Sequence, residues 1–145
     1  MISMYKRVII AVLQCTWGLP QTLAGAVLSL VLIKRRHFIY RGCVASEWSR
    51  PQSLSLGLFI FVSEQAQGEY HDALCAHEYG HCVQSLILGA LYLPLIALPS
   101  SVWCMVPYFE KLRRERGIGY YSFPTERWAN RIAEKVTGVK PDILQ

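Results

Sequence analysis

His77-Glu78-Tyr79-Gly80-His81 is the most informative stretch of this 145-residue sequence. If the stretch is helical, His77 and His81 project from one face, one turn apart, and both imidazoles can bind one metal ion. Glu78 then lies beside that ion and can accept a proton from a metal-bound water molecule. The alternative is a solvent-facing helix with two ordinary histidines, but the surrounding sequence favours a metal site.

The residues around the motif predict strands followed by a helix. Leu54 to Val62 has apolar residues at alternate positions, which predicts one strand with a buried side. A further strand is possible within Phe38 to Trp48, and the polar stretch 63–70 is expected to be a loop. The motif helix is expected from about Ala73 to Leu88, with Asp72 as its N-cap. We therefore expect an α+β fold in which a short antiparallel sheet or hairpin packs on the motif helix.

A C-terminal helix is expected to begin near Pro124, because proline favours the first helical turn and Glu126 adds an acidic side chain there. The expected end of this helix is Gly138. Between these two points runs an apolar stripe formed by Trp128, Ala129, Ile132, Ala133 and Val136.

Two long apolar blocks dominate the composition. Val8 to Ile33 is 26 residues without a charged side chain, and Val83 to Val106 is also free of charge. A helix needs about 20 apolar residues to cross a bilayer core. We therefore expect one membrane-associated domain over residues 1–145, with membrane segments at about 8–33 and 83–106. A signal peptide is the rival interpretation of the first block, but that block is too long for one and lacks a convincing cleavage site.

Prolines argue against straight helices in both blocks. Pro20 lies near the middle of the first block, where a kinked span or a tight hairpin is possible. In the second block, Pro94 and Pro99 each remove a backbone donor and crowd the preceding turn. If residues on both sides of the second block bind one ion, that block must dip into the membrane and return, or lie in its interface.

The charge distribution also favours a membrane surface. The formal net charge is +5, and the basic residues follow the two apolar blocks: Lys34, Arg35, Arg36 and Arg41 after the first, and Lys111, Arg113, Arg114 and Arg116 after the second. Attraction to anionic lipid explains these positions better than nucleic-acid binding, for which no motif is present. The five cysteines are odd in number and form no C-x-x-C pair, so we expect reduced, mostly buried thiols.

Two histidines do not complete a catalytic zinc site, which usually has three protein ligands and a fourth position for water. Zincins with a third histidine place it six residues after the motif, where this chain has Ile87. A carboxylate from a later helix is the remaining option. Glu126 is our preferred candidate and Glu110 the second choice. Asn130 lies one turn after Glu126, on the same helix face, and could hydrogen-bond a ligating histidine.

With these residues the chain resembles a small membrane-embedded zinc metallopeptidase of the gluzincin kind. The resemblance rests on His77, Glu78, His81 and Glu126, together with a strand that precedes the motif helix. It implies zinc as the cofactor, bound by the two histidines and Glu126, and a substrate held against an edge strand. The departure is Asn130, where the family has aspartate. Asparagine can accept a hydrogen bond from an imidazole N–H, but it lacks the charge that raises ligand basicity.

The expected activity is hydrolysis of a peptide bond. Glu78 would take a proton from a zinc-activated water molecule and pass it to the leaving amine. Tyr121 is the candidate donor to the oxyanion, with Tyr120 as the alternative. Packing or anchoring at the membrane interface is the other possible role of both tyrosines.

The expected partners are a peptide or membrane-protein substrate and the lipid bilayer, with no nucleic acid. By the positive-inside tendency, the basic flanks place the site on the cytoplasmic side of a bacterial cell membrane. Two other functions remain open: a non-catalytic zinc-binding membrane protein, and a zinc hydrolase of a non-peptide substrate. The sequence predicts no particular oligomeric state.

Overall fold

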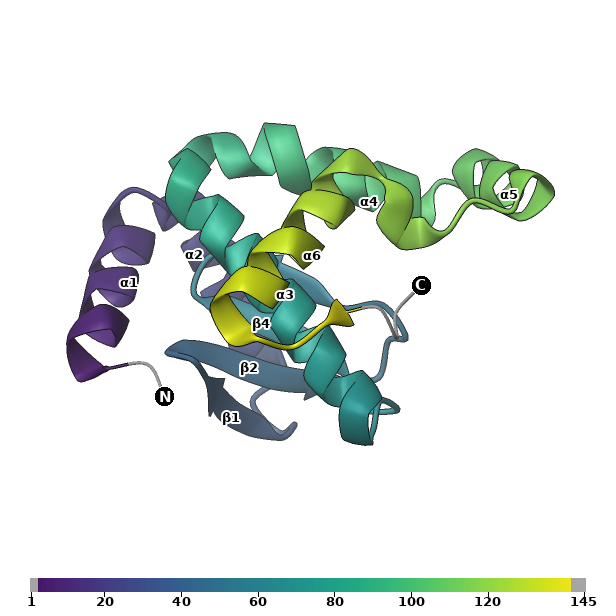
Figure 1. Ribbon diagram of the computed structural model, residues 1–145. Coiled ribbons are helices and arrows are strands. Elements are labelled where there is room, and N and C mark those ends of the chain that lie inside the picture. The colour runs from purple at the N-terminus through teal and green to yellow at the C-terminus, as the bar shows by residue number, and fades with distance from the viewer. Residues whose placement is uncertain (1–2, 142–145) are drawn as a thin grey trace.

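Helices from both ends of the chain surround a small sheet (Figure 1). The structure is a computed structural model that describes residues 3–141, and within them it has six α-helices and four strands, which confirms the expected α+β class. In chain order the elements are α1 (Met4–Thr16), α2 (Leu19–Val31), β1 (His37–Tyr40), β2 (Cys43–Trp48), β3 (Leu54–Leu56), β4 (Phe59–Ser63), α3 (Gly68–Leu88), η1 (Gly89–Leu91), η2 (Leu93–Ala97), α4 (Leu98–Met105), α5 (Pro107–Arg116), η3 (Tyr120–Ser122) and α6 (Pro124–Thr137).

The sheet is mixed, with strand order β1-β2-β4-β3. β1 pairs with β2 and β3 pairs with β4, both antiparallel, whereas the two inner strands β2 and β4 are parallel. The expectation of an antiparallel sheet is therefore wrong for the two inner strands, β2 and β4. Each hairpin is local in the sequence, but the parallel contact joins two hairpins and has no local signal.

Two stretches that were predicted as single strands are hairpins. Arg41 and Gly42 have φ values of 50° and 97° and turn the chain within the stretch 38–48. Gly57 has a φ of 60° and turns the chain within the predicted strand Leu54–Val62. Apolar residues continue to alternate through this second turn, so the alternation did not reveal it.

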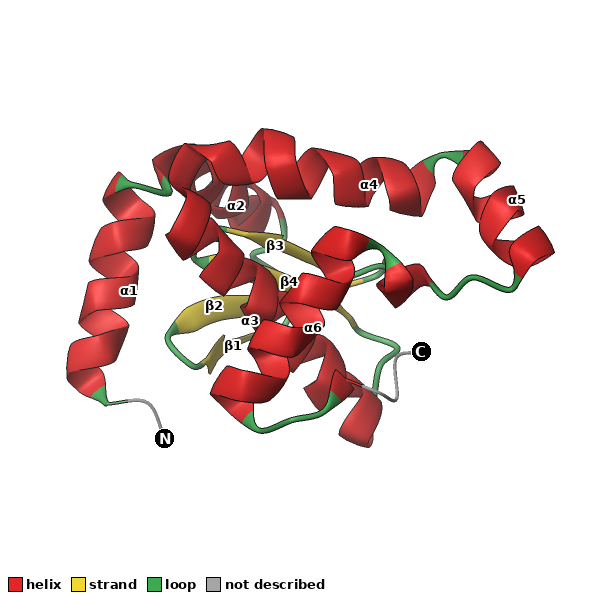
Figure 2. Cartoon of the chain, turned by 45° about the horizontal axis from the view of Figure 1, so that its top comes forward, coloured by secondary structure: helices red, strands yellow, loops and turns green. Residues whose placement is uncertain are grey.

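α3 is the central helix and lies between the sheet and α6 (Figure 2). It begins at Gly68 with Gln67 as its N-cap, so the expected start at Ala73 and the expected cap Asp72 are both wrong. The predicted loop 63–70 thus supplies the beginning of the helix. Twelve buried residues cluster between Ala73 and Ser85, because sheet and helices cover most of the circumference there.

Close contact between α3 and α6 depends on Gly80, the fourth residue of the motif. A Cβ atom at this position would lie 2.3 Å from the carbonyl oxygen of Ala129 on α6, which is far inside the contact distance. Glycine therefore lets the two backbones approach. α6 begins at Pro124 and is capped by Gly138, as predicted. Its end is also held by the Arg41 guanidinium, which donates a hydrogen bond of 2.6 Å to the carbonyl of Val136.

Buried glutamines join the α1–α2 pair to α3. The Gln14 amide donates to the carbonyl of Cys82 at 3.0 Å and accepts from the Ser85 hydroxyl at 2.9 Å. The Gln21 amide donates to Ser85 and to the carbonyl of Gly89, each at 2.8 Å. Because these groups are buried, their loss would leave unpaired polar atoms. The first apolar block is therefore packed against the motif helix.

Both apolar blocks are bent. The first forms α1 and α2, which meet at 99°, and the second runs from the end of α3 into α4 through a break of 120°. η2 (Leu93–Ala97), a π-helical turn that contains Pro94, lies just after this break. Within residues 3–141, each bent pair has the length and hydropathy of a membrane crossing only when its two helices are counted together, and no helix meets both requirements alone.

Candidate metal centre

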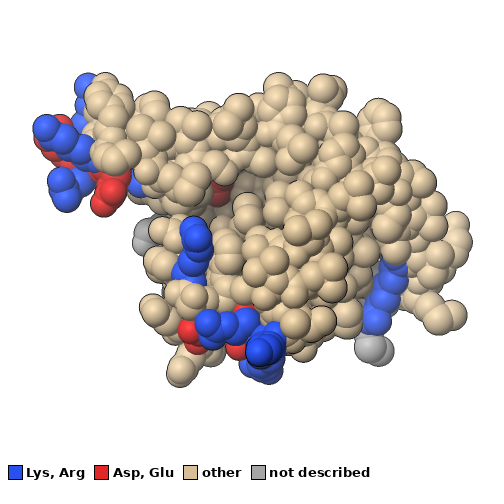
Figure 3. All heavy atoms as spheres, turned by 180° about the vertical axis from the view of Figure 1, so that it is seen from behind, with Lys and Arg blue, Asp and Glu red and all other residues tan. Residues whose placement is uncertain are grey.

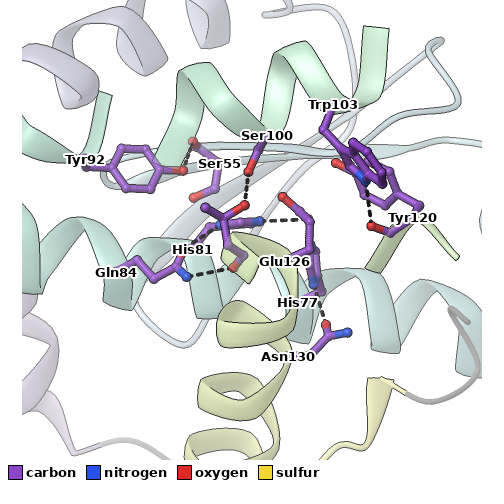
Figure 4. Close-up of polar contacts among 11 residues, drawn as sticks. Ser55, His77, His81, Gln84, Tyr92, Ser100, Trp103, Tyr120, Glu126 and Asn130 are labelled. Carbon is purple, nitrogen blue, oxygen red and sulfur yellow. Dashed lines mark hydrogen bonds and ion pairs between the residues drawn. The ribbon is translucent and has the colours of Figure 1, made fainter. Parts of the chain in front are cut away.

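Three side chains from two helices converge beneath α4 (Figure 4). His77 and His81 come from α3, and Glu126 comes from the first turn of α6. The Glu126 Oε2 atom is 3.0 Å from His77 Nε2 and 3.3 Å from His81 Nε2, and one ligand atom from each residue lies within 4.8 Å of the others. All three residues are buried, with at most 6% exposure. This cluster could hold a metal ion.

The donor atoms and spacing of the cluster are compatible with a bound metal ion. Tetrahedral zinc with bonds of about 2.0–2.1 Å separates its ligand atoms by about 3.3 Å, which is close to the two measured distances. The other carboxylate oxygen of Glu126, Oε1, is buried without a hydrogen-bond partner in the described part of the chain. An unpaired buried carboxylate oxygen is costly, and a cation would satisfy it. Two imidazoles and one carboxylate also match the donor set of several catalytic zinc sites.

Two carboxamides orient the histidine rings. The Nδ1 atom of His77 is 2.6 Å from Asn130 Oδ1, and the Nδ1 atom of His81 is 2.7 Å from Gln84 Oε1. Because a carbonyl oxygen can only accept, each Nδ1 donates its proton and each Nε2 faces the cluster. Gln84 is held in turn by its own Nε2, which donates to the carbonyl of Thr125 at 2.9 Å.

The sequence interpretation named Asn130 but missed Gln84. A signal was available, since Gln84 is three residues after His81, within hydrogen-bonding reach on one helix face, and carries the only side-chain amide in a block without charged residues. The Thr125 hydroxyl extends the network, because it lies 2.7 Å from the Ser100 hydroxyl on α4. Hydrogen bonds therefore link one candidate ligand to both α6 and α4.

The cluster is an ion pair at neutral pH when no metal is bound. Burial by itself lowers the pKa of His81, but the charge and hydrogen bond of Glu126 outweigh burial and raise that pKa to about 9. Burial by itself raises the pKa of Glu126, but His81 and His77 hold it well below its usual range. A protonated imidazole therefore faces an ionised carboxylate where a metal ion would lie.

Glu78 lies beside the cluster without joining it. Its side chain is 3% exposed, and its Oε2 atom has no hydrogen-bond partner among residues 3–141. Burial raises the pKa of Glu78, while the two neighbouring histidines, His77 and His81, oppose that shift. Glu78 therefore lies beside the candidate ligands with one carboxylate oxygen unpaired.

One cleft of about 800 Å³ is lined by the three candidate ligands and by Glu78. Its walls are β3 with the preceding loop 48–53, the end of α2, α4, and η3. This volume is within the usual range for sites that bind small molecules or short peptide segments. The cluster is therefore buried in protein on one side and open to a large cavity on the other.

The two candidate oxyanion donors also line the cleft. The Tyr121 ring packs edge-on against His77, with centroids 4.9 Å apart, and the Tyr120 ring packs edge-on against Tyr121. The backbone carbonyl of Tyr120 accepts a hydrogen bond of 2.9 Å from the Trp103 indole. Burial raises the pKa of both phenols, so each remains a neutral hydrogen-bond donor. Tyr121 packs directly on a candidate ligand, and Tyr120 lies behind it.

The second-choice ligand and the five cysteines lie outside the cluster. Glu110, the second choice for the third ligand, is exposed on α5 and does not belong to the cluster. All five cysteines are free thiols, and none of them is part of the cluster. Cys75 and Cys82, on either side of the motif, are buried as expected.

No protein-family model, curated protein or solved structure matches this chain.

Proposed function

We propose that this protein is a zinc-dependent, membrane-associated peptidase in which His77, His81 and Glu126 bind the ion. The main support is the position of three ligand atoms and the unpaired Glu78 oxygen along one cleft. A structural zinc site is usually closed by four protein ligands, whereas a catalytic site keeps a position open. Three ligands facing a cavity favour the catalytic kind of site.

The side chains have complementary roles in hydrolysis. When bound, zinc would acidify a water molecule and polarise the scissile carbonyl group. Glu78 accepts the proton of that water on its free oxygen and then delivers it to the leaving amine. The raised pKa of Glu78 makes it a stronger base for this transfer. Tyr121 donates a hydrogen bond to the developing oxyanion. The products are a carboxylate and an amine, with one water consumed.

β3 is the part of the predicted strand that could align a substrate. It is an edge strand, whereas β4 is paired on both sides, and Leu54 and Ser55 of β3 line the cleft. Leu56 and Phe59 close the hairpin, so the main-chain groups of the next residue, Ser55, face away from β4. The Ser55 carbonyl accepts a hydrogen bond of 3.0 Å from the Tyr92 hydroxyl (Figure 4). Ser55 is also only 1% exposed, so an extended peptide would have to displace the groups that cover this residue before it could pair with the N–H.

Association with a bacterial cell membrane, with the site on its cytoplasmic side, is part of this proposal. It is supported by the many exposed apolar side chains on α1, α2 and α4 and by the basic residues that flank them. Water-soluble monomers rarely expose so much apolar surface. The bends of 99° and 120° favour helices that lie in the membrane interface over helices that cross it straight.

The test combines metal analysis with hydrolysis of a randomised peptide mixture. We expect one zinc per chain and zinc-dependent cleavage by the wild type. Glu78→Gln should retain the zinc, and its kcat should be about 10²–10⁴-fold lower than that of the wild type, which is the usual contribution of a general base. Glu134→Gln, an exposed position on α6, is the matched control and should behave as the wild type.

Three other results would contradict the proposal. Peptide cleavage by Glu78→Gln at the wild-type rate would remove Glu78 from the mechanism. Zinc-dependent cleavage of esters or lipids, with no cleavage of peptides, would identify a hydrolase of another class. Bound zinc without hydrolysis of any of these substrates would identify a structural metal site.

A further inference from the structure

The helices α1, α2 and α4 and the end of α3 expose many apolar side chains, and two of these side chains also line the cleft. The apolar side chains that are each more than half exposed form a surface that we call the apolar face: Met4, Tyr5, Val8, Val12 and Trp17 on α1, Leu23, Val27, Leu30 and Val31 on α2, and Ile87, Leu91, Leu95, Leu98 and Met105 between the end of α3 and the end of α4. Figure 3 shows a broad tan area on this side of the molecule, with Lys and Arg side chains at its borders and a hollow in which an acidic side chain is visible.

The charges around the apolar face indicate that a lipid surface covers it. Lys6 and Arg7 precede the first apolar block, residues 34–36 follow it, and four basic residues in α5 follow the second block. Some of these charges are already paired, since Arg35 contacts Glu64, Arg36 contacts Glu47 and Lys111 contacts Glu115. The other basic side chains give the margin a net positive charge. In Figure 3 the Lys and Arg side chains lie at the margins of the tan area. Anionic headgroups would neutralise a basic margin, and the acyl region would cover the apolar centre. A second copy of the chain would bring the same positive charges to the contact and repel it.

The cleft opens on the apolar face. Val31 and Met105 are 74% and 67% exposed, and both also line the cleft. Leu28 and Leu32 extend the wall behind Val31. The loop 48–53 also lines the cleft, and it contains arginine, glutamine and serine side chains. The cleft therefore has an apolar edge, formed by α2 and Met105, and a polar edge, formed by the loop 48–53.

We propose, on the basis of the proposed peptidase function, that the substrate is a membrane-anchored polypeptide whose extended segment enters the cleft between Val31 and Met105, directly from the bilayer surface. An extended segment that leaves a bilayer passes from apolar to polar surroundings, as the two edges of the entrance do. Interfacial elements are buried by about 5–10 Å, which an extended chain covers in about three residues. Cleavage is therefore expected close to the membrane anchor of the substrate.

The test uses one randomised peptide cassette in three forms: free in solution, joined to a transmembrane helix by a linker of about 5 residues, and joined by a flexible linker of about 25 residues. The vesicles contain phosphatidylcholine with a minor fraction of phosphatidylserine. We expect kcat/KM for the short-linker form to exceed that of the free peptide by about ten-fold or more, because anchoring raises the effective concentration at the entrance. The long-linker form should fall between them.

Variants at the entrance separate a specific route from general membrane binding. Val31→Asp and Met105→Glu place a charge where the anchored segment enters, so each should reduce the preference for the short-linker form. Val12→Asp is the matched control, because Val12 belongs to the apolar face but does not line the cleft. It should weaken vesicle binding and leave the ratio between the substrates unchanged. Zinc content, measured for every variant, reports whether the metal centre is intact.

A second readout does not need turnover. In a Glu78→Gln background, a photoreactive residue at position 31 should crosslink to the short-linker substrate, and the same residue at position 12 should crosslink to lipid alone. Crosslinking to lipid alone at position 31 would overturn the inference, whether or not the protein hydrolyses peptides. The inference would also be overturned if the protein did not bind vesicles and formed a stable dimer through the apolar face.

The two proposals fail in different ways. Equal cleavage of free and anchored peptides, abolished in Glu78→Gln, would leave the peptidase function standing and overturn the membrane route. No Glu78-dependent cleavage of any form, with specific crosslinking at position 31, would overturn the peptidase function and leave an entrance that binds anchored peptides.

Discussion

Asn130 provides the sharpest test of how the metal centre is built. Its Oδ1 atom accepts the Nδ1 proton of His77 at 2.6 Å, and no other acceptor for that proton is found in the described part of the chain. Asn130→Ala would leave a buried N–H unpaired, because His77 is only 2% exposed. The imidazole ring would also lose the contact that directs its Nε2 toward the cluster. We expect weaker zinc binding and an intact fold, since alanine is favourable inside a helix.

The size of the effect follows from the hydrogen bond. Removing the partner of a buried donor costs about 1–3 kcal/mol, and about 1.4 kcal/mol corresponds to a ten-fold change in a dissociation constant. The expected loss is therefore about 10–100-fold in zinc affinity, which agrees with the usual effect of groups that orient a metal ligand. Asn130→Asp should act in the opposite direction, because a carboxylate accepts the same proton and adds a negative charge near the cation.

The assay is a competition titration of zinc against a chromophoric chelator at neutral pH. Thr137→Ala is the control on the same helix, since it removes a hydrogen bond to the carbonyl of Ala133 and does not touch the cluster. Zinc affinity of Asn130→Ala equal to that of the wild type would refute the reasoning. It would mean that the bond between Asn130 and His77 does not position a ligand.

Three further predictions concern the same centre. Gln84→Leu should weaken zinc binding by about ten-fold in the same titration, because the Nδ1 proton of His81 loses its acceptor; unchanged affinity would exclude Gln84 from orienting the ring. Zinc binding at pH 7 should release about one proton, because the raised pKa of His81, about 9, keeps its imidazole protonated in the metal-free protein. In the metal-free protein the His81 imidazole should lose this proton only as the pH rises through 9, which NMR titration of its ring protons measures; an imidazole that is already neutral at pH 7 would contradict the assignment. Gly80→Ala should lower the free energy of unfolding by about 1–3 kcal/mol, because its Cβ meets the Ala129 carbonyl and forces α6 away from α3. Chemical denaturation measures this, and wild-type stability would show that the helix contact adjusts without cost.

The sequence was sufficient where the determining interactions are local. The spacing of His77 and His81 is a property of one helix, and Pro124 and Gly138 mark a helix start and end by their own backbone preferences. The proximity of Glu126 to the histidines is not local. It was inferred from the usual number of protein ligands in a catalytic zinc site, which is three, so that one carboxylate donor was still missing.

The errors occur where tertiary contacts decide the structure. Gly57 turns the chain, yet the apolar residues on either side keep the same alternation because both strands of the hairpin face one core. The parallel pairing of β2 with β4 depends on how two separate hairpins meet. The role of Gln84 depends on the α6 backbone, whose Thr125 carbonyl holds its amide in place. None of these partners is near in the sequence.

The second apolar block shows how chemistry can restrict topology. His81 is two residues before this block and Glu126 is 20 residues after it, so a straight crossing would place the two on opposite sides of a bilayer. Shared binding of one ion requires the chain to return, and the prolines indicate where it can bend. The chain does turn by 120° between α3 and α4, and His81 Nε2 then lies 3.3 Å from Glu126 Oε2. The bend is therefore what lets two distant segments build one site next to the apolar face.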